Sequence, residues 1–311
     1  MHILKITIGK LLIVLGCVRL IKFLGRNKPI FIVLNYHNFS KYNNYGVKRG
    51  SILETGYDEQ FGHQIQWLSK HFKFLYPEEF FENKPKKGVY VLLTFDDGYK
   101  DNYDIAFPIL KKYNSKAIFF VVTKLIGTKE WLLHDKLRYL VTVETLTETE
   151  IENQLRQLNQ GKLIDQKYLS IVDNFDIPNH RLMMNWEELS EIINEGYFVQ
   201  PHTHNHSMLS ISPMEKQFAE LNTSIEVLTN KLNHNAKYFA FPNGMFNSTT
   251  LQILKKSIIN YSFTTISGIN TLDEDVFKIK RIGVNASDTL GVILLKLLRT
   301  ICIYTYCQDF I

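Results

Sequence analysis

The chain has 311 residues, 45% of them hydrophobic, and a formal net charge of +5 at pH 7. This composition is ample for a large core, and the length suits one large domain or two small ones. The mild charge, without a cluster of Lys and Arg interleaved with aromatic residues, gives no case for a nucleic-acid partner. The three cysteines, at positions 17, 302 and 307, lie near the ends, so the central region has no disulfide framework and no cysteine-based zinc site.

Residues 1–26 are apolar and basic, and no acidic residue precedes Glu54. The uncharged stretch, 11–18, is far shorter than the roughly 20 residues of a membrane-spanning helix. Three interpretations stay open: an amphipathic helix that lies on or anchors to a membrane, a signal peptide, or a helix packed against the main domain. Residues 289–311 are also apolar. They are expected to form the last helix of the domain, or to join the N-terminal helix at a membrane.

Between these ends, short apolar runs alternate with longer amphipathic segments. The helix 58–71 shows this best, with Phe61, Ile65 and Leu68 at helical spacing. Strands that alternate with helices predict a parallel α/β sheet or barrel, which periodicity alone does not distinguish. The expected strands are 30–34, 89–95, 117–122, 196–200, 238–241 and 261–265. The further expected helices are 103–113, 186–195, 213–232 and 248–257. A polar loop that could cover a site spans 40–55, and a helical insertion spans 131–177.

The strand 89–95 runs into the sequence Thr-Phe-Asp-Asp-Gly-Tyr at 94–99. Neighbouring side chains of a strand point in opposite directions, so Asp96 and Asp97 can serve different purposes. One carboxylate can bind a metal while the other moves protons. The plain alternative is a strand followed by an Asp-Gly turn.

A second polar cluster follows the strand 196–200, where three of the ten histidines fall within five positions: His202, His204 and His206. Imidazole and carboxylate groups together suit zinc and other divalent first-row metals. The tract alone could be a solvated loop. Together with the two acids it provides what a two-His, one-Asp site requires, with one coordination position open for water.

These motifs resemble those of the polysaccharide deacetylases, the carbohydrate esterase family 4 with its NodB-like fold. Thr-Phe-Asp-Asp-Gly is similar to the family's first motif, and 202–206 matches its His-(Ser/Thr)-x-x-His motif. The segments 239–244 and 277–282 resemble its third motif and a late strand, and 33–38 resembles the opening strand of the poly-N-acetylglucosamine-like subgroup. The resemblance implies a deformed, incomplete (β/α) barrel in one domain, 28–288, flanked by the terminal helices.

The resemblance also implies roles. Asp97, His202 and His206 would bind the metal, Zn²⁺ before Ni²⁺ or Co²⁺, and Asp96 would be the general base. The backbone amide of Asn243 would donate to the oxyanion; the alternative is an ordinary Pro-Asn-Gly turn. His204 is expected to be exposed or behind the ligands.

Two departures from the family pattern bear on catalysis. Ala240 stands where many members carry an arginine that supports the base, and no histidine follows His234 to serve as the late catalytic acid. His37, at the end of the first strand, is the candidate acid. The alternative for His37 is a side chain satisfied by hydrogen bonds in the barrel mouth.

The sequence therefore predicts a metal-dependent hydrolase that removes N-acetyl groups from hexosamine units of a cell-envelope or extracellular polysaccharide. We expect a monomer in the envelope or at a membrane. The alternatives are a barrel that binds glycan without turnover, and an O-acetyl esterase or peptidoglycan deacetylase with the same metal site.

Overall fold

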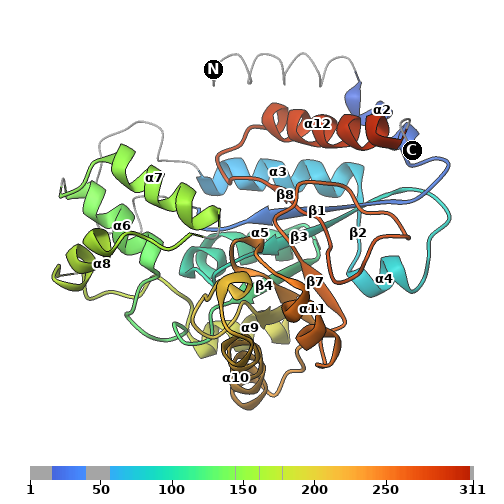
Figure 1. Cartoon of the computed structure of the whole chain (residues 1–311). Helices are drawn as coiled ribbons and strands as arrows, with labels where there is room; N and C mark the ends of the chain where they lie inside the picture. The colour runs from blue at the N-terminus through green and yellow to red at the C-terminus, as the bar shows by residue number, and fades with distance from the viewer. Residues whose placement is uncertain (1–15, 40–56, 144, 161, 177, 309–311) are drawn as a thin grey trace.

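The computed structural model describes residues 16–39, 57–143, 145–160, 162–176 and 178–308. A parallel sheet in the order β5-β4-β3-β1-β8 forms its centre, with β2 paired to β3 (Figure 1). A second parallel sheet contains β6 and β7. The strands are β1 Ile30–Tyr36, β2 Lys73–Phe74, β3 Val89–Phe95, β4 Ala117–Val121, β5 Phe198–Pro201, β6 Tyr238–Ala240, β7 Tyr261–Phe263 and β8 Ile282–Gly283.

Helices separate most of the strands, as predicted, although none lies between β7 and β8. They are α2 Cys17–Leu24, α3 Tyr57–His71, α4 Pro77–Phe81, α5 Phe107–Lys112, α6 Leu133–Thr142, α7 Glu148–Asn159, α8 Gln166–Asp173, α9 Trp186–Asn194, α10 Met214–Leu232, α11 Ser248–Lys255 and α12 Leu290–Gln308. The single helix expected at 103–113 is wrong at its start, because a π-helical turn, Asn102–Ala106, precedes α5. Pro108 falls in the first turn of α5, where its missing N–H does no harm. The expected loop 40–55 lies outside the described residues.

The strands enclose an apolar interior. Phe31, Leu92, Phe120, Tyr238 and Phe263, from five different strands, are buried in one cluster. The alternate residues of the central strands face outward, into a second cluster beneath the surrounding helices. The ring is incomplete at two steps: β5 and β6 belong to separate sheets, and beyond β7 there is only the isolated bridge between Phe263 and Ile279. This geometry, a deformed and incomplete (β/α) barrel, confirms the predicted fold.

The late strand expected at 277–282 is largely wrong. Only Ile282 of that segment belongs to β8, while Ile279 makes an isolated bridge to Phe263. The segment nevertheless crosses the last gap of the ring and carries Arg281 into the barrel.

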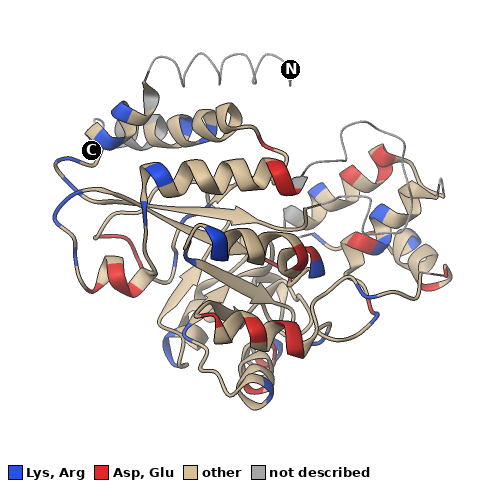
Figure 2. Cartoon of the chain, turned by 180° about the vertical axis from the view of Figure 1, so that it is seen from behind, with Lys and Arg blue, Asp and Glu red and all other residues tan. Residues whose placement is uncertain are grey.

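The C-terminal helix packs on the domain and against α2. In α12, Ile293, Leu294 and Leu297 are buried in the same cluster as Ile21 of α2. Neither helix contains an acidic residue, and the layer they form shows blue segments without red (Figure 2). Within the described ranges, no helix is both long and apolar enough to span a membrane.

The insertion between β4 and β5 has a core of its own. Helices α6, α7 and α8 lie together beside the barrel (Figure 1). Leu137, Leu140, Ile151, Tyr168 and Val172 are buried in a cluster separate from both barrel clusters. This small helical unit is therefore stabilised largely by its own contacts and can present a fixed face to the barrel mouth.

Candidate metal centre and catalytic site

The six predicted site residues line one cavity of about 480 Å³ at the carboxyl ends of the strands. The parallel strands deliver their C-terminal residues to the same edge of the barrel, which is where active sites of such barrels are built. Four loops far apart in sequence meet there, after β1, after β3, after β5 and after β6. The lining residues proposed from the sequence are His37, Asp96, Asp97, His202, His206 and Asn243.

Asp96 continues the inward-facing set of β3 and is almost fully buried. Arg281 holds it in a two-pronged ion pair, with Nη1–Oδ1 and Nη2–Oδ2 distances of 2.7 Å. Asn35 Nδ2 donates to Oδ2 over 3.1 Å. Burial is the largest single influence and would raise the pKa of Asp96, but the neighbouring groups, Arg281 first and then His202 and His37, together outweigh it and lower this pKa below the usual range. Asp96 is therefore an ionised, rigidly oriented carboxylate.

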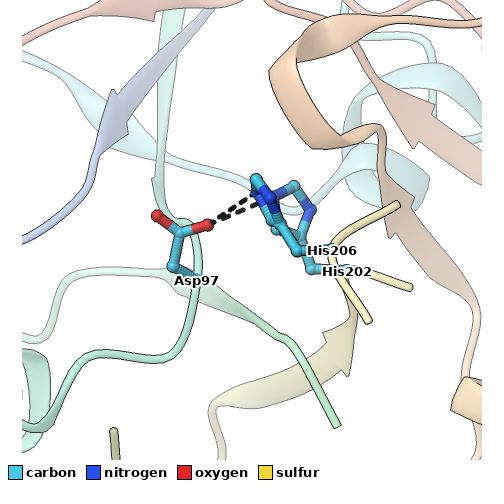
Figure 3. A group of neighbouring side chains, drawn as sticks. All are labelled: Asp97, His202 and His206. Carbon is cyan, nitrogen blue, oxygen red and sulfur yellow. Dashed lines mark ion pairs between the residues drawn. The ribbon is translucent and has the colours of Figure 1, made fainter. Parts of the chain in front are cut away.

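The carboxylate of Asp97 faces the imidazoles of His202 and His206 (Figure 3). Its Oδ1 lies 3.5 Å from His202 Nε2 and 3.2 Å from His206 Nε2. The nearer contact is not aligned as a hydrogen bond, and Oδ1 is a buried oxygen without a hydrogen-bond partner among the described residues. The three ligand atoms lie within 4.8 Å of one another. A buried oxygen that faces two ring nitrogens in this way fits a divalent cation between them.

A backbone carbonyl group fixes the orientation of the His202 ring. Its Nδ1 lies 2.8 Å from the carbonyl oxygen of Ala240, so Nδ1 carries the proton and Nε2 is left as the ligand atom. Burial lowers the pKa of His202 to about 4, which keeps the imidazole neutral, as metal binding requires. Burial would also raise the pKa of Asp97, but His206 lowers it well below the usual range.

The backbone of the site is strained. Asp97, Thr203, His206 and Asn243 all have positive φ, with values from 53° to 76°. Residues other than glycine occupy this region at a cost on the order of 1–3 kcal/mol each, and such residues gather at functional sites. Gly98, at φ 86°, follows Asp97, and a Cβ there would lie 3.0 Å from Val121. The strained turn swings Asp97 out of the strand's alternation and toward the histidines.

Glu220 of α10 holds the histidine loop in place. Its Oε2 accepts from the backbone N–H groups of His204 and Asn205, and its Oε1 accepts from Asn205 Nδ2 and Ser207 Oγ. The four bonds are 2.8–3.0 Å long, and Glu220 is buried. All four partners are donors, so an acceptor-only carboxylate suits this position better than an amide.

The substitution Glu220→Gln is expected to weaken zinc binding by about tenfold, because the amide group meets donors and loosens the loop that carries His202 and His206. Isothermal titration of the metal-free protein with Zn²⁺ measures this. Glu215→Gln, at an exposed position on the same helix, is the matched control and should bind like the wild type. Equal zinc affinity in the two variants would contradict this role of Glu220.

His37 and Asn243 also line the cavity. The side chain of His37 is 50% exposed, and its Nε2 lies 3.8 Å from Asp96 Oδ2. Asn243 stands in a short 3₁₀ turn after β6, with φ 53° and ψ 14°. His204 points elsewhere: its Nδ1 lies 2.9 Å from Thr123 Oγ1, consistent with the prediction that it stands apart from the metal ligands.

Two groups of residues at the site were not predicted from the sequence. Arg281 supplies the support for Asp96 that Ala240 cannot give, and it comes from a segment in which Lys278 and Lys280 also stand, so its charge alone did not mark it. His134 of α6 also lines the cavity, with Nε2 at 2.8 Å from Tyr99 Oη and 4.0 Å from Asp97 Oδ2. Tyr99 in turn donates to the buried Asp135. Nothing in the residue pattern of the insertion marked His134 as a site residue.

Comparisons with known proteins find relatives in sequence and in fold. The poly-beta-1,6-N-acetyl-D-glucosamine N-deacetylase of Staphylococcus epidermidis is 28% identical over 277 residues, which cover 85% of this chain and 82% of the relative. Two solved structures share the fold. IcaB from Ammonifex degensii is 21% identical with a TM-score of 0.60, and the deacetylase PplD from Streptococcus pyogenes is 23% identical with a TM-score of 0.58. Each match covers 88% of this chain and 97% of the solved one.

A family model described as polysaccharide deacetylase matches residues 83–261, more than half of the chain. The matched range contains Asp96, Asp97, His202, His206 and Asn243. The family is one of metal-dependent hydrolases that act on polysaccharides, which accords with the Asp97, His202 and His206 cluster. The chain belongs to the polysaccharide deacetylase family.

Proposed function

We propose that the protein is a zinc-dependent N-deacetylase of a β-1,6-linked N-acetylglucosamine polymer. The observation that carries the proposal is the pairing of two carboxylates with different surroundings: Asp97 faces two imidazoles, and Asp96 faces a buried arginine. The named substrate of the Staphylococcus epidermidis relative supports the polymer and its linkage. Three nitrogen and oxygen ligands favour Zn²⁺, with Ni²⁺ or Co²⁺ as replacements.

The chain's own residues supply the proton transfers. Zn²⁺ bound by Asp97, His202 and His206 would supply Lewis-acid chemistry, which lowers the pKa of water and polarises a carbonyl. Asp96 stays ionised beside Arg281 and takes a proton from the attacking water as general base. Because Arg281 and Asn35 fix both oxygens of Asp96, the base does not reorient during the reaction.

Two further residues complete the proposed reaction. His37, exposed at the cavity edge, would give a proton to the leaving sugar amine, which makes the departing group neutral. The backbone N–H of Asn243 would donate to the oxygen of the acetyl group as charge develops on it. The strained backbone of Asn243 is in keeping with this role.

We also propose that the enzyme works as a monomer at the membrane surface of the cell envelope. Supporting this, Leu20 and Phe23 of α2 are 49% and 58% exposed, and the helix carries Arg19 and Lys22. An exposed apolar side with flanking basic residues suits an anionic lipid surface. Fractionation of cells that express the chain with and without residues 1–26 tests this; a truncated protein that stays with the membrane fraction contradicts it.

Acetate release tests the activity. The purified protein is incubated with β-1,6-linked and β-1,4-linked N-acetylglucosamine oligomers, a peptidoglycan fragment and an O-acetylated sugar, with and without a chelator. We expect the fastest release from the β-1,6-linked oligomer, its loss on chelation and its recovery with Zn²⁺. Release that survives chelation, or release from the O-acetylated sugar alone, contradicts the proposal. Binding without any release would identify a glycan-binding barrel.

A further inference from the structure

The helical insertion forms one wall of the catalytic cavity. His134 and Arg138 of α6 and Leu155 and Leu158 of α7 all line it, although the insertion has its own separate core. The first pair is spaced i, i+4 and the second i, i+3, so each helix turns a single face toward the cavity. Since the barrel supplies the proposed metal ligands and base, this wall is available for another purpose, contact with the substrate.

The wall combines an apolar part with a cation. Leu155 and Leu158 are only half-buried against the insertion core, so part of each side chain meets the cavity. Arg138 Nη1 lies 3.9 Å from Oδ1 of the fully buried Asp135, which anchors one end of the guanidinium. The charge of Arg138 acts within the cavity, because its side chain lines the cavity beside His134.

We propose that this face of α6 and α7 is the glycan-binding wall, on which Leu155 and Leu158 contact an N-acetylhexosamine ring and Arg138 disfavours a neighbouring ring whose amine is free. The inference rests on the proposed function and deepens it. The C–H face of a pyranose ring packs well on leucine side chains. An acetylated hexosamine is neutral, whereas its deacetylated product is a cation that Arg138 repels.

Repulsion between Arg138 and a free sugar amine would affect the pattern of deacetylation in the product. Repulsion between Arg138 and a cationic ring, which the buried carboxylate of Asp135 partly offsets, would lower kcat/KM by roughly fivefold. Each deacetylation event would therefore make the adjacent ring a poorer substrate. The enzyme would leave free amines spaced along the polymer rather than in runs.

The test uses two β-1,6-linked trisaccharides, one fully acetylated and one with a free amine on an outer ring. Their kcat/KM values are compared below the pKa of the sugar amine, and again above it. Wild type should prefer the fully acetylated compound about fivefold when the amine is protonated and lose the preference when it is neutral. Arg138→Gln should lose the preference at both pH values, Arg138→Lys should keep it, and Arg138→Glu should reverse it.

Arg156→Gln is the matched control, because Arg156 is an exposed arginine on α7 of the same insertion. It should behave like the wild type. A preference that Arg138→Gln retains, or that persists with a neutral amine, overturns the inference. If wild type releases no acetate from any glycan, the proposed function is contradicted, whereas the inference about the glycan-binding wall is not. The same comparison is then made by binding: a ratio of dissociation constants that Arg138→Gln removes supports the wall, and an unchanged ratio overturns it.

Discussion

Replacement of Asp96 by asparagine is expected to lower kcat for deacetylation by about 1,000-fold, because a general base typically contributes 100- to 10,000-fold. Asparagine has nearly the same shape as aspartate but cannot accept a proton at neutral pH. Zinc affinity should change by less than about threefold, since Asp96 faces Arg281 and Asn35 rather than the two imidazoles. Acetate release and zinc titration of the same preparation measure the two effects.

The control for this prediction is Asp58→Asn, which removes an exposed carboxylate from the first turn of α3. It should retain the full rate. If Asp96→Asn keeps more than a tenth of the wild-type activity, Asp96 is not the base. If it loses zinc as well as activity, the separation of roles between Asp96 and Asp97 is wrong.

The strand ends and their acids could be predicted from the sequence because they depend on local patterns. The apolar run 89–93 marks a buried strand, and the change from alternation to Asp-Asp-Gly marks its end. The helix 58–71 follows from the spacing of Phe61, Ile65 and Leu68, all of which are fully buried. These features require only the residues within one or two turns or strands.

Arg281 could not be predicted in the same way because its role depends on the closure of the barrel. It lies 185 residues from Asp96 in the sequence, and the segment that carries it pairs only through one isolated bridge, at Ile279, and the two-residue strand β8. His134 depends on how the insertion packs against the barrel mouth, which neither periodicity nor composition specifies. In both cases the missing information is tertiary contact between segments that are irregular or inserted.

The substitution Arg281→Met is expected to destabilise the metal-free protein by about 3–5 kcal/mol at neutral pH, because it leaves the charge of Asp96 buried and unpaired. Arg281→Lys keeps a charge but not the two-pronged geometry, so it should fall between Met and wild type. Urea unfolding measures both. The double variant Asp96→Asn with Arg281→Met should be more stable than Arg281→Met alone, since it removes both charges.

The pH dependence of the stability lost in Arg281→Met follows from the pKa of Asp96. In the wild type the folded-state pKa is lowered, so the carboxylate contributes stability above its unfolded value of about 4, and the contribution is lost as pH falls through the folded pKa. Without Arg281, burial raises the pKa of Asp96 above the unfolded value. The penalty of Arg281→Met should therefore shrink on acidification, as Asp96 takes up a proton in the folded state, and the acid limb of kcat/KM should move to higher pH. A penalty that is equal at neutral and acidic pH would show that Arg281 stabilises the barrel through packing rather than through the charge of Asp96.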